Sequence, residues 1–172
     1  MRRLSYGVAM SLDGFIAGPK GENDWIIPDP EIDFAAIWAR FDTLLMGRRT
    51  YEVARIRATQ WPDLGHRWIV ISRTLKPEDH PKVTIISSGI ADAVATLKAQ
   101  PGKDIWLFGG GVLFRDLLDA GLIDTVEVMV MPVMLGSGVP MLPEGRRQSL
   151  DLASSKASSR GVLNLTYFVP GL

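Results

Sequence analysis

The sequence contains no cysteine, no excess of charge of either sign and no long hydrophobic run. Without cysteine the chain forms no disulfide, no thiolate metal site and no thiol nucleophile. The 19 basic residues balance the 19 acidic ones, so the overall basic charge typical of nucleic-acid-binding proteins is missing. No window approaches the roughly 18 apolar residues of a membrane span. We therefore expect neither a nucleic acid nor a membrane as partner.

Histidine is also scarce, and a secretion signal is not evident. His66 and His80 lie far apart without an accompanying carboxylate pattern, which argues against a metal site. Two arginines near the amino terminus precede an apolar run, but Ser5, Ser11 and Asp13 interrupt it too early for a signal peptide. We expect a cytoplasmic protein without a bound metal.

What the chain does contain is the composition of one globular domain, which we expect to span residues 1–172. Hydrophobic residues make up 47% of it and charged residues 22%, enough for a core of its own. Apolar runs typical of strands alternate with helical patterns, and a terminal antiparallel hairpin is expected around residues 159–161. This order predicts an α/β fold with a mixed, mostly parallel sheet flanked by helices. Strands are expected at 4–10, 15–17, 43–46, 68–71, 83–87, 105–108 and 125–134, and helices at 31–41, 49–57, 90–99 and 112–120.

Three glycines mark the first of three junctions that could bind a ligand. Gly109, Gly110 and Gly111 connect a predicted strand to a predicted helix. Glycine lets a ligand approach the backbone, and a helix start offers free N–H groups to a pyrophosphate. The spacing matches neither the dinucleotide fingerprint GxGxxG nor a Walker loop. A tight turn between strand and helix would explain the glycines equally well.

Two further junctions carry arginines and hydroxyl groups. Arg48 and Arg49 are adjacent at a predicted helix start, where the dipole disfavours cations unless an anion is bound; a solvated pair is the alternative. Ser72 and Arg73 follow the next strand and suit a phosphate monoester, although an ordinary polar turn would look the same. Open α/β sheets bind ligands beyond the carboxyl ends of their strands. Together the junctions predict a phosphorylated dinucleotide, and NADPH suits the arginines better than NADH.

Proton chemistry would need an acid, and four carboxylates lie near the apolar loop that contains Trp25. The four are Asp24, Asp29, Glu31 and Asp33. Partial burial of Asp33 against neighbouring apolar side chains would raise its pKa and make it an acid. The alternative is a helix-start residue that binds backbone amides. Asp13, before a glycine, is interpreted as a turn residue.

Five segments in this order resemble a known superfamily. They are AMSLDGFIA at 9–17, Asp24-Trp25, LMGRRTYE at 45–52, FGGG at 108–111 and MPVMLGSG at 131–138. The chain resembles the dihydrofolate reductase-like superfamily over almost its whole length. It is most similar to the C-terminal reductase domain of the riboflavin-biosynthesis deaminase/reductase, as a stand-alone member. The resemblance implies a three-layer fold with NADPH as hydride donor.

Position by position, the resemblance also implies site residues. Trp25 would correspond to the tryptophan of a mobile loop over the active site, and Asp33 to the substrate-facing acid, with Glu31 as its competitor. The remaining matches concern the cofactor: Ala9 and Ile16 beside the nicotinamide; Gly47, Arg48, Arg49 and Thr50 on the adenosine and phosphate side; Ser72 and Arg73 at the 2′-phosphate; and Phe108, Gly109, Gly110, Gly111 and Val112 around the pyrophosphate.

The function implied is that of an NADPH-dependent oxidoreductase. It would transfer hydride to a C=N or C=O carbon of a heterocyclic or ribosyl small molecule, with 5-amino-6-(5-phosphoribosylamino)uracil of riboflavin biosynthesis as the leading substrate. Because residues 48–52 are more similar to dihydrofolate reductase, dihydrofolate or another pterin is the alternative. A non-catalytic NADPH-binding protein and an unrelated structural α/β module are further hypotheses. We also expect a homodimer, paired through the long apolar strand at 126–134.

Overall fold

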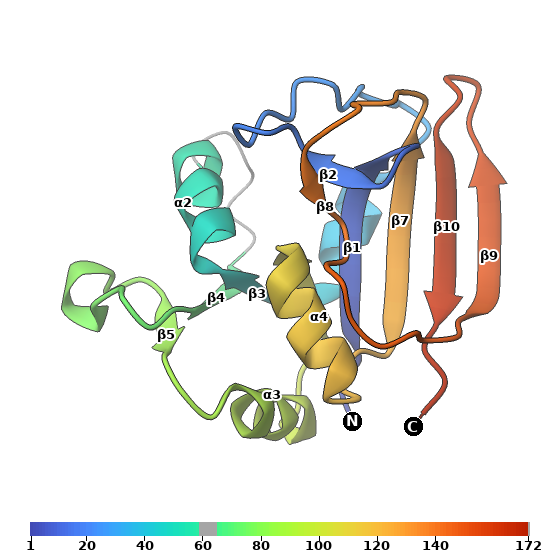
Figure 1. Cartoon of the computed structure of the whole chain (residues 1–172). Coiled ribbons are helices and arrows are strands. Elements are labelled where there is room, and N and C mark those ends of the chain that lie inside the picture. Colours follow the sequence, from blue (N-terminus) through green and yellow to red (C-terminus); the bar gives the residue numbers. More distant parts are fainter. Residues whose placement is uncertain (59–64, 172) are drawn as a thin grey trace.

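The computed structural model describes residues 1–58 and 65–171, and its centre is an eight-stranded sheet. The strand order across the sheet is β5-β4-β3-β6-β1-β7-β10-β9 (Figure 1). Its strands are β1 (Leu4–Ser11), β3 (Phe41–Gly47), β4 (Arg67–Ile71), β5 (Thr84–Ile86), β6 (Asp104–Gly109), β7 (Thr125–Met131), β9 (Asp151–Ala157) and β10 (Leu163–Phe168). Two short strands, β2 (Phe15–Ala17) and β8 (Val139–Pro140), form a separate antiparallel ribbon.

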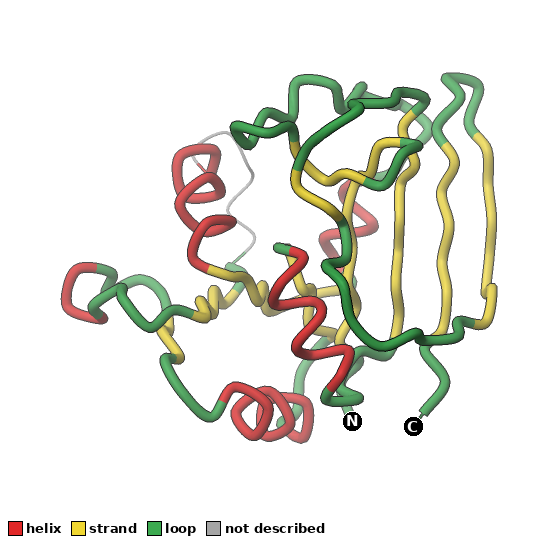
Figure 2. Tube along the Cα trace, in the orientation of Figure 1, coloured by secondary structure: helices red, strands yellow, loops and turns green. Residues whose placement is uncertain are grey.

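The first six strands of this order pair in parallel, and the last two pairings of the order are antiparallel. β10 runs antiparallel to β7, and β9 antiparallel to β10, so the chain ends in a hairpin at one side of the sheet. Figure 2 shows the strands as one continuous layer with helices on both sides. The predicted mixed, mostly parallel sheet with a terminal antiparallel hairpin is therefore confirmed.

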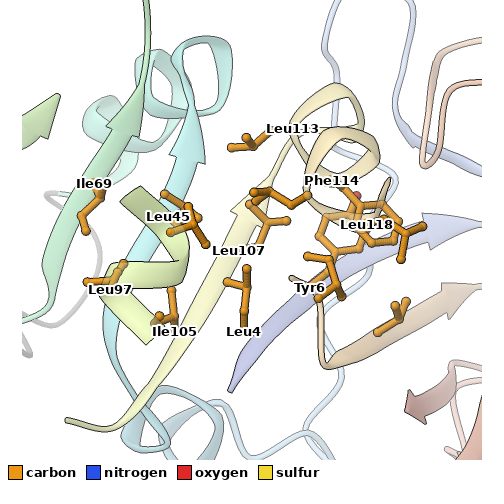
Figure 3. Packing of buried hydrophobic residues seen from close by; sticks show 14 of the residues in the cluster. Leu4, Tyr6, Leu45, Ile69, Leu97, Ile105, Leu107, Leu113, Phe114 and Leu118 are labelled. Atoms are coloured by element: carbon orange, nitrogen blue, oxygen red, sulfur yellow. The ribbon is translucent and has the colours of Figure 1, made fainter. Parts of the chain in front are cut away.

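Helices α1 (Phe34–Ala39), α2 (Arg48–Arg57), α3 (Ile90–Ala99) and α4 (Gly111–Asp119) complete the layers. On one face Tyr6 of β1 stacks on Phe114 of α4 with ring centroids 3.9 Å apart, and α3 adds Leu97 to the same cluster (Figure 3). On the other face Trp38 of α1 meets Trp106 of β6 at 5.0 Å. Since successive strand residues point to opposite faces, β3, β4 and β6 each supply apolar side chains to the clusters on both faces.

Two expected elements end earlier than predicted. The helix expected at 31–41 is confined to α1, because the Asp33 carboxylate caps it and the backbone of Phe41 already belongs to β3. The strand expected at 125–134 ends at Met131, because Pro132 has no N–H for the sheet. β7 lies between β1 and β10, so both of its edges are hydrogen-bonded. β7 therefore has no free edge at which a second copy of the chain could add a strand.

None of the helices in the described part of the chain has the length and hydrophobicity required to cross a membrane.

Candidate active site

The three junctions predicted to bind a ligand lie at one edge of the sheet. β4, β3 and β6 are parallel neighbours, so their carboxyl ends meet there. The backbone enters α2 directly after β3, reaches Ser72 after β4, and enters α4 through Gly110 after β6. Sequence order alone could not establish this adjacency, which depends on where each strand inserts into the sheet.

The starts of α2 and α4 leave backbone amides available. Gly47 and Gly110 are the two N-cap residues, and neither helix start has a side-chain hydrogen bond. A Cβ at Gly47 would meet nothing within 4 Å, and one at Gly110 only the Thr50 hydroxyl oxygen at 3.6 Å. Free N–H groups beside open space, with two helix dipoles directed at it, suit a pyrophosphate.

Backbone geometry and packing account for the other two glycines, Gly109 and Gly111. Gly109 has φ +143°, a conformation that residues with a side chain rarely adopt. A Cβ at Gly111 would lie 2.7 Å from the carbonyl oxygen of Pro140, because β8 passes directly over the start of α4. Of the flanking residues predicted to bind the cofactor, Phe108 is half-buried in β6 and Val112 is exposed.

Arg48 connects the second junction to the third. Its Nε donates to Glu52 at 2.8 Å, and another guanidinium nitrogen donates to the Thr74 hydroxyl at 2.9 Å. The dipole of α2 disfavours the positive charge of Arg48 at the helix start, and Glu52, four residues further along α2, compensates this charge. The arginine positions the turn after β4 relative to α2, whether or not an anion is bound.

Ser72, Arg49 and Arg73 differ in accessibility. Ser72 is buried, and its hydroxyl accepts hydrogen bonds from the amides of Thr74 and Leu75, so it shapes the turn. Arg49 and Arg73 are exposed, and neither side chain forms a hydrogen bond or ion pair with the residues that the structure describes. Both guanidinium groups are therefore available to a phosphate at this edge.

Ala9 and Ile16, the residues predicted to border the nicotinamide, are half-buried on β1 and β2. Ala9 is paired with Met129 of β7 near the carboxyl end of β1. Tyr6 faces α4, so the alternation along β1 places Ala9 on the opposite face, which is the face covered by α1.

Asp13 is the turn residue that the sequence predicted, and it also holds a second segment. Its carboxylate accepts hydrogen bonds from the Ser11 hydroxyl at 2.7 Å and from the amides of Leu135 and Gly136 at 3.0 and 2.7 Å. These bonds, that of Ser11 above all, lower the pKa of Asp13 to about 2. The β1–β2 turn is thereby attached to the segment that follows β7.

The acids predicted as proton donors have other partners in this structure. Asp33 is exposed and accepts a hydrogen bond from the Ala36 amide at 2.9 Å, so the expected burial against apolar side chains is not found. Glu31 is exposed and accepts from the hydroxyl and the amide of Ser159, bonds that lower its pKa. Both carboxylates already accept hydrogen bonds from protein donors. The indole N–H of Trp25 donates to the Glu22 carbonyl at 3.1 Å within the same loop.

Asp29, one of the four carboxylates near the loop that contains Trp25, is buried in the structure. It is only 4% exposed, one carboxylate oxygen accepts from the Glu31 amide, and the other lies buried without a hydrogen bond of normal geometry. The neighbouring Ser158 hydroxyl is the main reason that its pKa is lowered. Its burial results from the β9–β10 hairpin folding over the loop, a long-range contact with no local sequence signal.

A cavity of about 260 Å³ lies between α1 and the sheet. Apolar side chains of both layers form most of it, including Phe34 and Ile37 of α1 and Trp106 of β6. Trp106 packs over Gly7, where a Cβ would lie 2.6 Å from the indole nitrogen. The polar side chains that line it are Glu31, Glu127, Lys156, Ser158, Asn164 and Thr166. Within the described ranges, no group of three or more side chains could hold a metal ion.

Two polar links join the α1 region to the sheet at the rim of this cavity. One is the bond of Glu31 to Ser159 of the β9–β10 hairpin. The other is the pair between Arg40, just after α1, and Glu127 of β7, joined by two hydrogen bonds of 2.9 and 2.6 Å. The hydrogen bond to Glu127 raises the pKa of Arg40. The cavity thus lies under a short helix held by these links.

Comparisons with known proteins agree with this arrangement. The uncharacterized protein YyaP of Bacillus subtilis (strain 168) is 34% identical over 178 residues, covering 96% of this chain and 94% of that protein. The riboflavin biosynthesis protein RibD of Corynebacterium ammoniagenes is 26% identical and covers 86% of this chain, but only 48% of RibD is matched. The present chain therefore corresponds to about half of that protein.

Solved structures show the same fold. A putative riboflavin biosynthesis protein from Shewanella sp. PV-4 superposes with a TM-score of 0.84 at 29% identity, covering 99% of both chains. Dihydrofolate reductase from Enterococcus faecalis, solved with NADP(H) and RAB-propyl, gives a TM-score of 0.70 at 19% identity, covering 97% and 96%. The predicted dihydrofolate reductase-like fold is confirmed. Residues 2–164 match the model of the RibD C-terminal domain, and the chain belongs to that family.

Proposed function

We propose that this protein is an NADPH-dependent reductase that transfers hydride to a C=N or C=O carbon of a small heterocyclic or ribosyl substrate. The observation that carries the proposal is the carboxyl edge of β4, β3 and β6. Two helix starts without side-chain caps and two exposed arginines meet there, and a cavity with mainly apolar walls lies between α1 and the same sheet. The match to the RibD C-terminal domain supports the same reading.

Different residues of this edge would bind different parts of the cofactor. The amides after Gly47 and Gly110 would bind the pyrophosphate, and Arg49 and Arg73 the 2′-phosphate. Ala9 and Ile16 would border the nicotinamide. When bound, NADPH supplies the hydride, and the protein aligns the two rings and excludes water around them.

Reduction of a C=N or C=O bond also consumes a proton. Glu31 and Asp29 both have lowered pKa values and are charged near neutral pH, which favours water at the mouth of the cavity as the proton source. Asp33 and Glu31 would then orient water or substrate, and Trp25 would cover the site with its loop. The pH profile of kcat distinguishes water from a carboxylic acid as the proton donor, since a carboxylic acid donor would give a loss of rate above its pKa.

The leading substrate is 5-amino-6-(5-phosphoribosylamino)uracil, as in the reductase step of riboflavin biosynthesis. Purified protein is mixed with NADPH and this compound, and loss of the reduced nicotinamide absorbance is followed. We expect turnover that saturates with both reactants. Tight NADPH binding without turnover of any substrate would identify a non-catalytic binding protein, and the absence of NADPH binding would overturn the proposal.

A second candidate substrate is dihydrofolate or another pterin. The fold shared with the Enterococcus faecalis dihydrofolate reductase and the residues 48–52 favour it. The same assay with dihydrofolate decides between the two, because the ratio of their kcat/KM values measures the discrimination directly.

A further inference from the structure

The register of the sheet aligns residues of four strands in one row, and three of them, Met129, Asn164 and Lys156, line the cavity. Ala9 of β1 is paired with Met129 of β7, Met129 with Asn164 of β10, and Asn164 with Lys156 of β9. Paired residues point to the same face, and for this row it is the face covered by α1. The row therefore leads from the residue beside the proposed nicotinamide to a lysine at the sheet edge.

A neighbouring row adds one more polar side chain. Glu127 of β7 is paired with Thr166 of β10, two residues from Asn164 and on the same face. Lys156, Asn164 and Thr166 all line the cavity and form one side of it, which we call the hairpin wall. They come from β9 and β10, which precede and follow the turn near Ser159.

The polar groups of the cavity differ in whether they already have partners. The acids are occupied: Glu127 is bound by Arg40, and Glu31 by Ser159. The three side chains of the hairpin wall form no hydrogen bond or ion pair with the described residues, although the charge of Lys156 is close enough to affect Glu31. The unused capacity is therefore mainly that of donors: an ammonium, an amide and a hydroxyl.

The spacing of these groups along the row determines how long a substrate must be to reach them. Adjacent strands lie roughly 4.8 Å apart, so Lys156 is about 14 Å from Ala9 along the row. A ring reduced next to Ala9 would lie over Met129. A group attached to that ring by a short tail would then reach Asn164 and Lys156.

We propose that the hairpin wall binds an acceptor-rich anionic group, a phosphate or a carboxylate, on the tail of the substrate, and that Lys156 and Asn164 decide specificity for it. This inference rests on the proposed reductase function, which places the reacting ring beside Ala9. Glu31 and Glu127, the acids that line the cavity, already have partners, and Asp29 lies outside the lining, so an anion that enters the cavity would meet free donors there.

The test uses two pairs of compounds, each with and without the anionic tail. One pair is 5-amino-6-(5-phosphoribosylamino)uracil and its dephosphorylated form; the other is dihydrofolate and the bare dihydropterin ring. Binding to the NADP⁺-saturated protein is measured by calorimetry, and turnover is measured separately with NADPH. The variants are Lys156→Gln and Asn164→Leu, with Arg160→Gln as the control, since Arg160 is an exposed cation of the same hairpin outside the cavity lining.

We expect the wild type to prefer the tailed member of at least one pair, and Lys156→Gln to weaken its binding about tenfold to a hundredfold while leaving the untailed member unchanged. The pair of compounds for which Lys156→Gln weakens binding of the tailed member shows whether the hairpin wall binds a phosphate or a carboxylate. Equal losses for both members, no loss in either variant, or the same loss in Arg160→Gln would overturn the inference. A tail preference without NADPH oxidation would overturn the reductase function alone, and no binding of any compound would overturn both.

Discussion

Single residues in this protein combine structural and chemical roles that sequence patterns do not separate. Arg48 was predicted as a phosphate ligand, and in the structure it also pairs with Glu52 and binds Thr74. Asp33 matched a catalytic acid by position and caps α1. Residue type and spacing identified these positions as site candidates, and their binding and catalytic roles stay predictions. The partners depend on β4 and α2 being neighbours, which the local sequence does not encode.

Asp13 makes a specific prediction about acid stability. Its folded-state pKa is lowered from the usual 3.8 to about 2, so its carboxylate stabilises the fold above about pH 4, and this contribution is lost as the pH falls toward 2. Asp13→Asn should lower Tm at neutral pH and flatten its decline in acid. Thermal unfolding between pH 7 and pH 2 measures both, with the exposed Asp24→Asn as control. Parallel curves for wild type and Asp13→Asn would contradict the assignment.

Arg73 makes a prediction about cofactor choice. If its exposed guanidinium binds the 2′-phosphate, Arg73→Gln should raise KM for NADPH by about tenfold or more and leave KM for NADH unchanged. Steady-state kinetics with both nucleotides provides the measurement. Arg55→Gln, an exposed arginine near the other end of α2, should change neither value. Equal effects of Arg73→Gln on the two nucleotides would exclude a 2′-phosphate contact.

At the scale of elements, strand and helix types were predictable and their limits were not. The periodic apolar patterns of β7 and α4 are strong enough to identify them. The two-residue strand β8 has no such pattern, and it exists because residues 15–17 lie next to it. Gly138 shows the closeness of that pairing, since a Cβ there would lie 2.2 Å from the Ala17 carbonyl oxygen.

The start of α4 offers a test of this packing. Gly111→Ala would push a methyl group against backbone oxygens of Pro140 and Met141 at 2.7 and 2.8 Å. We expect it to lower the free energy of unfolding by about 1–3 kcal/mol and to weaken NADPH binding. Val112→Ala, at an exposed neighbouring position, should change stability by no more than about 0.5 kcal/mol. Urea unfolding and nucleotide titration report the two effects. A Gly111→Ala protein as stable as wild type would contradict this prediction, because it would mean that β8 shifts to accommodate the methyl group at little energetic cost.

At the scale of the whole molecule, the open edge of the sheet bears on assembly. All seven residues of β9 are exposed, and its outer side has no partner strand in the described chain. An unpaired edge with an apolar side chain such as Leu152, 57% exposed, is a template for a second strand. We propose that the homodimer expected from the sequence forms through β9 rather than through β7.

Light scattering during size-exclusion chromatography tests this proposal. The wild type should elute with twice the mass of 18.9 kDa, and Leu152→Lys should shift it toward the monomer, because a charge on an edge strand opposes pairing. Val53→Lys, on the exposed surface of α2, is the matched control and should leave the mass unchanged. A wild-type monomer at all concentrations would refute the dimer, and a Leu152→Lys dimer would refute this interface.

The sequence by itself determined the α/β class, the mostly parallel sheet, the terminal hairpin and the positions of the glycine and arginine junctions, because these follow from local periodicity and residue type. Only the tertiary structure decided that three strand ends are neighbours, that β7 is interior, and that Asp29 is buried. It also decided that the hairpin wall of Lys156, Asn164 and Thr166 forms a side of the cavity. These features arise from contacts between segments far apart in the chain, where the strand order and register of the sheet, rather than any local preference, determine which side chains meet.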